Sequence, residues 1–307
     1  MRSNIVLFNP SSGKGRSLKK KEHLSSALNK YSIEHEFIIT KSEAHLRELV
    51  HTHADAKSII AVGGDSTITI AADEIIKGKH NVTLGLIPLG SSDDIALDYG
   101  ITDLEKAVSV IHKAETRQTD IGKITENGNT VCHFLGQANI GIGVAVNRYV
   151  ANAVHKNRFL SKNQTLAGLA GMMHAYKKHE VPVQAHIVHP EENMDGEFTS
   201  LLFSKIRYWA SGLLYAPSAK PDDGDLHAVF IKSCPLLRLL RLTQLAANGR
   251  HVKQEETVTV SANKFRVRLN SPFQIQVDGD ILQQSNQERN FTEVEFSTLP
   301  LAIKVFR

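Results

Sequence analysis

The sequence predicts two folded parts: a doubly wound α/β domain with a parallel sheet, followed by a β-sandwich domain. Short apolar segments alternate with helix-like segments through the first third of the chain, and strand-length segments separated by turns fill the rest. At 307 residues the chain is long enough for two domains. We expect the α/β domain at 1–127, completed by 296–307, the sandwich at 128–295, and an active site in the cleft between them.

The α/β expectation rests on apolar runs of strand length, each followed by a longer helix-like segment. Short apolar strands separated by helices of about ten residues or more indicate βαβ units. Ligands of such sheets bind beyond the carboxyl ends of the strands. The expected strands are 5–8, 35–40, 58–62 and 83–87, and the expected helices are 17–31, 42–53 and 67–76.

The pattern changes near residue 125, where helix-length segments become rare. Strand-length segments with turn residues between them are typical of an antiparallel sandwich. The expected strands are 131–135, 181–189, 198–209, 226–232, 257–262 and 265–269, and a helix-rich insert is expected at 162–178.

The composition is that of a globular protein, with 41% hydrophobic and 22% charged residues. No apolar run reaches the length of about 18 residues that a membrane-spanning helix needs, and the first residues lack a signal-peptide pattern, so we expect a cytoplasmic location. The two cysteines show no metal-binding spacing. The net charge of +4 is compatible with phosphates or an anionic membrane surface. Lys14, Arg16, Lys19, Lys20 and Lys21 have no aromatic residues between them, which disfavours nucleic-acid binding.

Small and polar residues follow three of the expected strands. The segment 9–15, Asn-Pro-Ser-Ser-Gly-Lys-Gly, comes after the first strand, and its glycines allow a ligand to approach the backbone. The segment 63–67, Gly-Gly-Asp-Ser-Thr, opens a helix whose amides can face an anion, with an N-cap aspartate as the alternative. The segment 88–96 contains serines and aspartates that are also ordinary helix caps. Because all three follow strand ends, we expect one polar crevice that accepts anions.

Two acidic segments lie in the β-rich part. The segment 215–226 contains Asp222, Asp223 and Asp225 around a glycine, and such oxygen-rich turns suit Mg²⁺ or Ca²⁺. A solvated hairpin turn is the alternative. Asp278-Gly279-Asp280 follows an alternating strand. A carboxylate there could serve as a general base, although Asp-Gly is also a common hairpin turn.

Taken in order, these segments resemble the bacterial diacylglycerol kinases and soluble lipid kinases, which share the diacylglycerol kinase catalytic domain. The pattern Asn-Pro-x-Ser-Gly matches residues 9–13, Gly-Gly-Asp-Gly-Thr matches 63–67, and Pro-Leu-Gly-Thr-x-Asn-Asp-Phe-Ala matches 88–96. Further matches are Thr40, Asp120-Ile121-Gly122, Gly141-Ile142-Gly143, the segment 219–226 and the late Asp-Gly-Glu at 278–280. The resemblance covers nearly the whole chain.

Several residues depart from the family pattern. Ser66 replaces a glycine in the second loop, which adds a side chain near the phosphates. If the loop keeps the glycine conformation, Ser66 must adopt a positive φ, which is unfavourable for a residue with a side chain. Ile70 replaces the usual glutamate, Asp93 replaces an asparagine, and Asp280 replaces a glutamate. Asp93 adds negative charge beside a site that should receive a triphosphate. A catalytically impaired relative that binds nucleotide or lipid is therefore an alternative function.

The resemblance implies an ATP-dependent kinase that transfers the γ-phosphoryl group to a lipid hydroxyl, diacylglycerol being one candidate, as in phospholipid biosynthesis. Mg²⁺ would bridge the phosphates, held through Asp65 and organised by Asp94, and Asp278 or Asp280 would deprotonate the acceptor. A second, structural Mg²⁺ would use the Asp223 side chain and the carbonyl oxygens of Lys220 and Asp225. The expected nucleotide-binding residues are Asn9, Ser12, Gly13, Thr40, Gly63, Gly64, Asp65, Ser66, Thr67, Gly90, Ser91 and Asp94.

Further alternatives concern the substrate and the surface. A sphingoid-base kinase differs only in its acceptor, and NAD kinases share a Gly-Gly-Asp loop and a β-rich second half. The leucine-rich segment 235–245, with Arg238 and Arg241, is either an interfacial helix at a membrane or a core helix with outward arginines. Transient membrane contact and a homodimer are both compatible with the resemblance.

Overall fold

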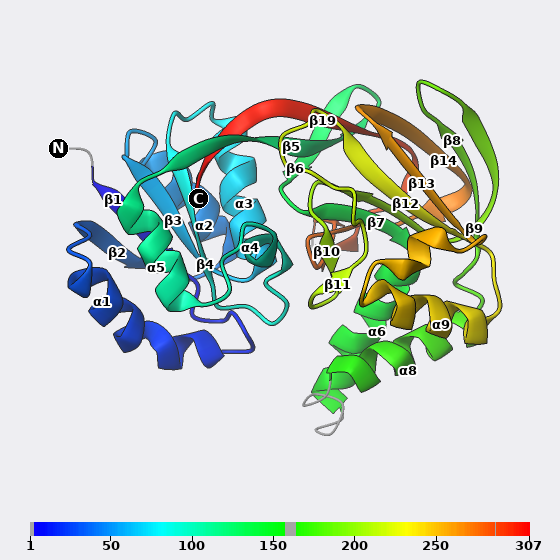
Figure 1. Cartoon of the computed structure of the whole chain (residues 1–307), viewed down its shortest axis with the longest axis horizontal. Coiled ribbons are helices and arrows are strands. Elements are labelled where there is room, and N and C mark those ends of the chain that lie inside the picture. The colour runs from blue at the N-terminus through cyan, green and yellow to red at the C-terminus, as the bar shows by residue number, and fades with distance from the viewer. Residues whose placement is uncertain (1–2, 157–163, 286) are drawn as a thin grey trace.

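The computed structural model describes residues 3–156, 164–285 and 287–307, and it combines an α/β part with a β-rich part (Figure 1). One continuous sheet runs through both parts, in the order β16-β15-β7-β9-β8-β14-β19-β4-β3-β1-β2. The predicted fold class is confirmed, whereas the boundary at 127/128 stays a prediction because no break in this sheet marks it.

The α/β part contains four parallel strands, of which three are mainly buried and apolar, as expected for a sheet covered on both faces, while the edge strand His35–Ile39 is partly exposed. The strands are β1 (Asn4–Phe8), β2 (His35–Ile39), β3 (Ser58–Gly63) and β4 (Thr83–Pro88). The helices are α1 (Lys21–Lys30), α2 (Glu43–Thr52), α3 (Asp65–Lys77), α4 (Asp94–Asp98) and α5 (Leu104–Lys113), with a 3₁₀ turn at Arg16–Lys20. Ser42 and Asp103 cap α2 and α5 through hydrogen bonds from His45 N (3.1 Å) and Lys106 N (2.8 Å).

Two long strands connect the parts. β5 (Thr116–Glu126) and β19 (Phe291–Phe306) pair in antiparallel fashion, and both extend from the α/β part into the β-rich part (Figure 1). The end of β19 also pairs in parallel with β4, through Lys304 and Thr83. The C-terminal residues therefore complete the sheet of the α/β part.

The β-rich part is built mainly from antiparallel pairs. Its larger strands are β6 (Asn129–Phe134), β7 (Gln137–Gly141), β8 (Val183–Val188), β9 (Asn193–Ser204), β12 (Leu226–Lys232), β13 (Thr257–Ala262) and β14 (Lys264–Phe273). Short strands are β10 (Tyr208–Trp209), β11 (Leu213–Leu214), β15 (Gln276–Val277), β16 (Asp280–Ile281), β17 (Gln283–Gln284) and β18 (Gln287–Glu288). Phe203 stacks on Phe296 in the core, with ring centroids 4.1 Å apart.

Three helices and a 3₁₀ turn accompany these strands: α6 (Ile142–Lys156), α8 (Gln164–Lys177), α9 (Leu236–Ala246) and Arg250–Lys253. The predicted insert at 162–178 corresponds to α8, and its residues 162 and 163 lie outside the described residues. α6 was not expected from the sequence, because its β-branched residues between 142 and 154 do not favour a helix over a strand.

The leucine-rich segment forms the amphipathic helix α9. Leu239, Leu242 and Ala246 are buried against a core cluster of the β-rich part, as the core interpretation requires. Arg238 pairs with Glu256, whereas Leu237 is 81% exposed. Among the described helices, none combines the length and the apolar character needed to cross a bilayer.

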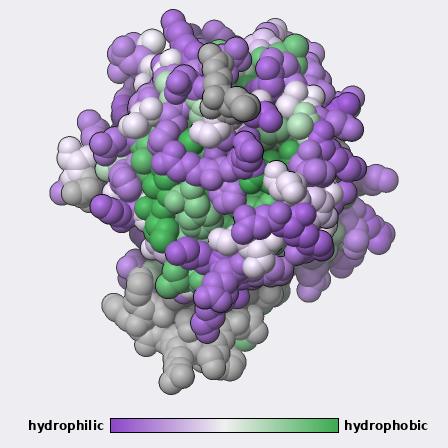
Figure 2. Space-filling view, turned by 90° about the vertical axis from the view of Figure 1, so that its left-hand side faces the viewer, coloured by the Kyte–Doolittle hydropathy of each residue, from purple (hydrophilic) through white to green (hydrophobic). Residues whose placement is uncertain are grey.

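One face of the molecule is shown in Figure 2, turned by 90° from the view of Figure 1. Hydrophilic side chains cover most of this face, and hydrophobic side chains gather in one area near its centre. Large hydrophobic side chains that are exposed include Leu237 on α9 and Met173 on α8, two helices that pack against each other. The two helices that carry these exposed side chains also line the cavity described below.

Candidate active site

The three polar loops that follow β1, β3 and β4 come together at one edge of the sheet. The side-chain amide of Asn9 donates to Thr67 Oγ1 at 2.9 Å, which joins the first loop to the second. Leu89 N donates to Gly63 O at 2.8 Å, which joins the third loop to the second. The predicted convergence of these turns is thus present in the structure.

Glycines allow the loops to approach one another closely. A Cβ atom added to Gly90 would lie 2.5 Å from Gly64 Cα, closer than real Cβ atoms come. Gly13 has φ +58°, and a Cβ there would lie 2.9 Å from Leu89 O. Larger residues at Gly13 or Gly90 would push the loops apart.

Ser66 differs from what its position in the motif predicted. It lies in the first turn of α3 and has the negative φ of a helix, so the loop does not require a left-handed residue there. The expected backbone strain is therefore absent, because the helix begins at Asp65 and already includes residue 66. The Ser66 side chain instead faces Asp280 closely enough to lower its pKa, and Asp280 is another position where this chain departs from the family pattern.

Asp93 has the left-handed backbone that aspartate and asparagine tolerate, with φ 57°. Its carboxylate accepts hydrogen bonds from Gly90 N, at 2.8 Å to Oδ1 and 3.1 Å to Oδ2. Burial raises the pKa of Asp93 to about 6, the Gly90 amide lowers it, and neighbouring Asp94 raises it. Asp93 therefore directs a negative charge at an amide of the third loop.

Asp65 lies at the centre of this loop cluster. Its carboxylate accepts hydrogen bonds from Ile95 N at 2.9 Å and Asp94 N at 3.1 Å, and so holds the start of α4. Loss of surrounding water raises the pKa of Asp65 to about 8, and the charges of Asp94, Asp278 and Asp93 add to the rise. A cation bound beside these carboxylates would therefore stabilise the ionised form of Asp65.

Asp94 connects the α/β part with the β10–β11 hairpin of the β-rich part. Its carboxylate accepts hydrogen bonds from Gly212 N at 2.7 Å and Ser211 N at 3.1 Å. Burial raises its pKa, and these two amides lower it. Asp94 thus fixes the position of the β10–β11 hairpin relative to the three polar loops.

Asp278 and Asp280 lie on the hairpin that joins β15 and β16. Asp278 and Gly279 both have positive φ, 44° and 97°, which matches a two-residue type I′ turn. The hairpin interpretation was therefore correct, and the same turn points Asp278 into the site. The two carboxylates differ in exposure, since Asp278 is 5% exposed and Asp280 is exposed.

Asp278 is held by donors from three elements. It accepts hydrogen bonds from Thr69 Oγ1 at 2.5 Å, Gln137 N at 2.6 Å and Gly136 N at 3.2 Å. Burial raises the pKa of Asp278 to about 6, although these donors oppose the rise. Asp280 has a raised pKa as well, because the surrounding protein excludes water from part of its carboxylate, while Ser66 lowers it.

These groups line one cavity of about 770 Å³. Its polar end contains predicted site residues Asp65, Ser91, Asp94, Asp278 and Asp280, together with Lys14. Its other end is apolar and is enclosed by α6, α8, α9 and the β10–β11 hairpin, through Ile142, Val146, Val150, Leu169, Met172, Trp209, Leu213 and Leu239. The site thus joins a charged crevice to a long apolar pocket.

Two residues of the cavity were not identified from the sequence. Gln137 and Gln276 line it, and the buried oxygen Oε1 of each has no hydrogen-bond partner among the described residues. Buried polar atoms normally have hydrogen-bond partners, so these two oxygens are exceptions within the described part of the chain. Glutamines within strands give no sequence signal, and only the fold places these two beside Asp278.

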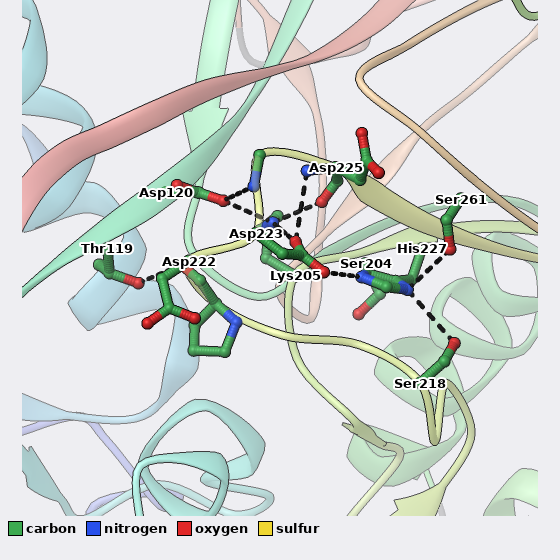
Figure 3. A network of polar contacts seen from close by, with 12 residues as sticks. Thr119, Asp120, Ser204, Lys205, Ser218, Asp222, Asp223, Asp225, His227 and Ser261 are labelled. Atoms are coloured by element: carbon green, nitrogen blue, oxygen red, sulfur yellow. Dashed lines mark hydrogen bonds and ion pairs between the residues drawn. The ribbon is translucent and has the colours of Figure 1, made fainter.

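Other predicted residues lie beside the cavity or away from it. The Thr40 hydroxyl donates to Phe8 O at 3.2 Å and is buried. Ser12 is half-buried in the first loop, where its carbonyl accepts from Ser17 N. Lys220 does not line the cavity, and Asp223 and Asp225 belong to a separate network around Lys205 (Figure 3). No group of three or more His, Cys, Asp or Glu side chains in the described part of the chain is arranged to hold a metal ion.

Comparisons with known proteins relate both parts of the chain to one kind of enzyme. The model of the diacylglycerol kinase catalytic domain matches residues 3–124, and that of the YegS C-terminal NAD kinase beta sandwich-like domain matches residues 136–307. The chain is 25% identical to a diacylglycerol kinase of Bacillus subtilis, covering 91% of this chain and 90% of that one. It is 24% identical to a diacylglycerol kinase of Mycobacterium tuberculosis, covering 98% and 94%.

The fold is similar to that of solved structures. A putative diacylglycerol kinase from Bacillus anthracis superposes with a TM-score of 0.77 at 17% identity, over 99% of this chain and 97% of that one. A second structure with the same description and source gives 0.76 at 16% identity, over the same shares of the two chains. Both parts of the fold and their arrangement are therefore shared with these proteins.

Proposed function

Since this chain belongs to the diacylglycerol kinase family, with a diacylglycerol kinase catalytic domain followed by a YegS-type C-terminal domain, we propose that it transfers the γ-phosphoryl group of ATP to a lipid hydroxyl. The observation that carries this proposal is one cavity that is lined by carboxylates, serines and Lys14 in one part and by apolar side chains in another. The polar part offers hydrogen-bonding and charged groups for a triphosphate, and the apolar part offers a surface for acyl chains. Phosphoryl transfer then takes place where the two ends meet, beside Asp278.

The charged end supplies what a triphosphate needs. The glycines of three loops let the backbone segments approach one another closely, and the N-terminus of α3 adds the positive end of a helix dipole. Lys14 lines the cavity, and Arg16 is close enough to influence the titration of Asp93. These groups offset the charge of the phosphates, while Asn9 and Thr67 hold the first two loops together.

The residues present also fit a nucleotide-bound Mg²⁺. Burial raises the pKa of both Asp65 and Asp94, and the charges of neighbouring carboxylates raise that of Asp65 further, so a divalent cation stabilises the ionised carboxylates. Asp65 and Asp94 would hold Mg²⁺ together with the phosphates and water. When bound, Mg²⁺ neutralises the charge that develops on the transferred phosphoryl group.

Asp278 is our choice for the base that accepts the proton of the lipid hydroxyl. Thr69, Gly136 and Gln137 fix its carboxylate, and a pKa of about 6 keeps it ionised at neutral pH without making it a weak base. Asp280 is exposed and also lines the cavity, so we assign it to positioning the acceptor.

The side chains that line the cavity select the acceptor. Asp278 takes the single hydroxyl proton of a lipid alcohol. The apolar end of the cavity, near Leu239 and Met172, then takes the acyl chains. A diacylglycerol satisfies both requirements, and a sphingoid base is the variant that adds an ammonium group.

The proposal is tested by measuring ATP turnover on a panel of acceptors: diacylglycerol, monoacylglycerol, a sphingoid base and NAD⁺. We expect phosphorylation of diacylglycerol in mixed micelles, dependent on Mg²⁺. Binding of ATP without transfer to any lipid would favour the impaired relative, and formation of NADP⁺ would favour the NAD kinase. Either result would contradict the proposed function.

Replacing Asp93 by Asn should strengthen nucleotide binding at neutral pH. The amide keeps an acceptor for Gly90 N and suits the left-handed backbone, while it removes one negative charge beside the phosphates. At pH 8 we expect about five-fold tighter binding of Mg-ADP, which corresponds to about 1 kcal/mol. Because Asp93 has a pKa of about 6, the difference from wild type should shrink below pH 6, where the carboxyl group becomes neutral.

This dependence is measured by calorimetric titration of Mg-ADP between pH 5 and 8 for both proteins. Asp103→Asn, which changes an exposed helix cap instead, is the matched control and should leave the affinity unchanged. An Asp93→Asn variant that binds no tighter at pH 8 would show that the Asp93 charge does not face the phosphates.

Membrane contact should depend on the exposed ends of α8 and α9. We expect the double variant Leu237→Glu with Met173→Glu to bind anionic lipid vesicles about tenfold more weakly, because two apolar side chains that could enter the interface are lost. Turnover on a short-chain lipid in solution should be unaffected. Vesicle sedimentation measures the first quantity, and Leu301→Glu, another exposed leucine, is the control. Equal binding of all three proteins would rule out this surface.

A further inference from the structure

A lysine ammonium group lies where the acidic turn at 215–226 suggested a divalent cation. Lys205 follows the end of β9, and its side chain is 0% exposed. Its Nζ donates to Asp120 Oδ2 at 2.8 Å, to Asp223 Oδ1 at 3.1 Å and to the carbonyl oxygen of Asp225 (Figure 3). An ammonium group has three donors, so every one of them is used.

The acceptors are themselves fixed in place. Asp120 Oδ1 accepts from Leu301 N at 2.8 Å, and its Oδ2 also accepts from Gly224 N at 2.7 Å. Asp120 N in turn donates to Pro221 O at 2.7 Å. Lys205 therefore fastens the loop 220–225 to β5 and β19, the two strands that connect the parts of the molecule.

The second carboxylate oxygen of Asp223 also has a hydrogen-bond partner. Its Oδ2 is 2.8 Å from His227 Nε2, and His227 Nδ1 lies 2.9 Å from Ser261 Oγ and 3.2 Å from Ser218 Oγ (Figure 3). Burial alone would raise the pKa of Asp223, but the hydrogen bonds from His227 and Lys205 lower it below its usual value. Asp223 is thus an ionised carboxylate shared between two basic side chains.

These residues do not fit a structural Mg²⁺. Two of the three groups expected around such an ion, the Asp223 carboxylate and the Asp225 carbonyl, are the acceptors of Lys205. An Mg²⁺ ion bound to these two oxygens would lie in the space that Lys205 Nζ occupies. It would also need oxygen ligands at about 2.1 Å on all sides. An ammonium group and a dication at this position would also repel each other in a buried environment.

We propose that the Lys205 ammonium group takes the place of a divalent cation in this chain, so that the loop 220–225 is held without metal. Lys205 supplies one positive charge and three directed hydrogen bonds, against Asp120, Asp223 and one carbonyl oxygen. Its removal leaves two carboxylates and a carbonyl around a small space, which is a latent site for Mg²⁺ or Mn²⁺. This inference is independent of the proposed phosphoryl transfer.

The test compares thermal unfolding of wild type and Lys205→Ala without nucleotide, in EDTA and with increasing Mg²⁺ or Mn²⁺. The wild-type Tm should show no cation response that depends on Asp223. The variant should have a lower Tm in EDTA and regain part of the loss with a saturable dependence on the cation. Adding Asp223→Asn to the variant should remove this recovery, and any response that remains belongs to another site.

Lys77→Ala is the matched control, because Lys77 Nζ also contacts two acidic residues, Asp73 at 2.7 Å and Glu74 at 3.5 Å. Arg47 stays beside those carboxylates, so no cation dependence should arise. The inference is overturned if Lys205→Ala shows no recovery with either cation. If that variant does not fold, a Mn²⁺ titration of the wild type decides: a bound ion that is lost in Asp223→Asn overturns the inference, and its absence supports it.

Discussion

Replacing Asp278 by Asn is expected to lower kcat for lipid phosphorylation by about 10²–10⁴-fold while Mg-ATP binding is retained. Asp278 lines the cavity, and Thr69, Gln137 and Gly136 hold its carboxylate. The amide is close in shape to the carboxylate but cannot accept the proton of the lipid hydroxyl. A nucleotide-binding titration beside the kinetic assay separates loss of transfer from loss of the site.

The same role predicts how wild-type turnover depends on pH. Because the pKa of Asp278 is raised to about 6, kcat should fall as the pH drops below 6 and the carboxylate becomes protonated. Asp280→Asn is the matched control on the same hairpin and should lower kcat by no more than about tenfold. If Asp280→Asn proves the more damaging of the two, the proton is accepted by Asp280 and the assignment is reversed.

Replacing Asp65 by Asn should remove the Mg²⁺ dependence of nucleotide binding and lower kcat/KM by more than about 100-fold. Asp65 is the carboxylate that the second loop places beside Asp94, where the cation would neutralise both groups. Asparagine keeps one acceptor for the amides at the start of α4, so the fold should survive. Nucleotide titrations with Mg²⁺ and with EDTA measure the effect directly. If the ratio of the two affinities is the same in the variant as in wild type, the prediction is contradicted.

Asp65 also predicts a change in stability with pH. Its pKa is raised to about 8 in the folded chain, above the unfolded value of about 3.8, so the folded state binds the extra proton between these limits. The stability that this proton contributes is present at low pH and is lost as the pH rises through about 8. The Tm of wild type without Mg²⁺ should therefore fall more steeply between about pH 5 and 8 than that of Asp65→Asn, and the two should change in parallel above that range.

The strands of the α/β part could be predicted to within about one residue. Parallel strands that are buried on both faces are short apolar runs, and 5–8, 58–62 and 83–87 show this pattern plainly. The three loops that follow them could be assigned to one site for the same reason, since strand ends of one sheet meet at one edge. This argument needs only the chain order of strands and loops.

Contacts between distant segments could not be predicted in this way. Ser66 was expected to strain the second loop, but the helix includes it, and its partner Asp280 is more than 200 residues away in the sequence. Lys205 comes directly after a buried strand, and no local pattern distinguishes it from an exposed lysine. Its role depends on where β5 and the loop 220–225 meet in space.

The helix α6 shows a different limit. Its residues between 142 and 154 include valines, an isoleucine and glycine, which are as compatible with a strand as with a helix. Tertiary packing decides the outcome, because α6 packs against α8 and encloses the apolar end of the cavity. The apolar part of the cavity therefore had no signal in the sequence, whereas the three polar loops had several.

The most direct test of the account is a crystal structure of the chain with Mg²⁺ and a non-hydrolysable ATP analogue. We expect the phosphates to lie between the first loop, the N-terminus of α3 and Gly90, with the γ-phosphate facing Asp278. A nucleotide bound elsewhere, or an Asp93 carboxylate that keeps the Gly90 amide and leaves no room for a phosphate, would contradict the idea that three separate turns form one triphosphate site.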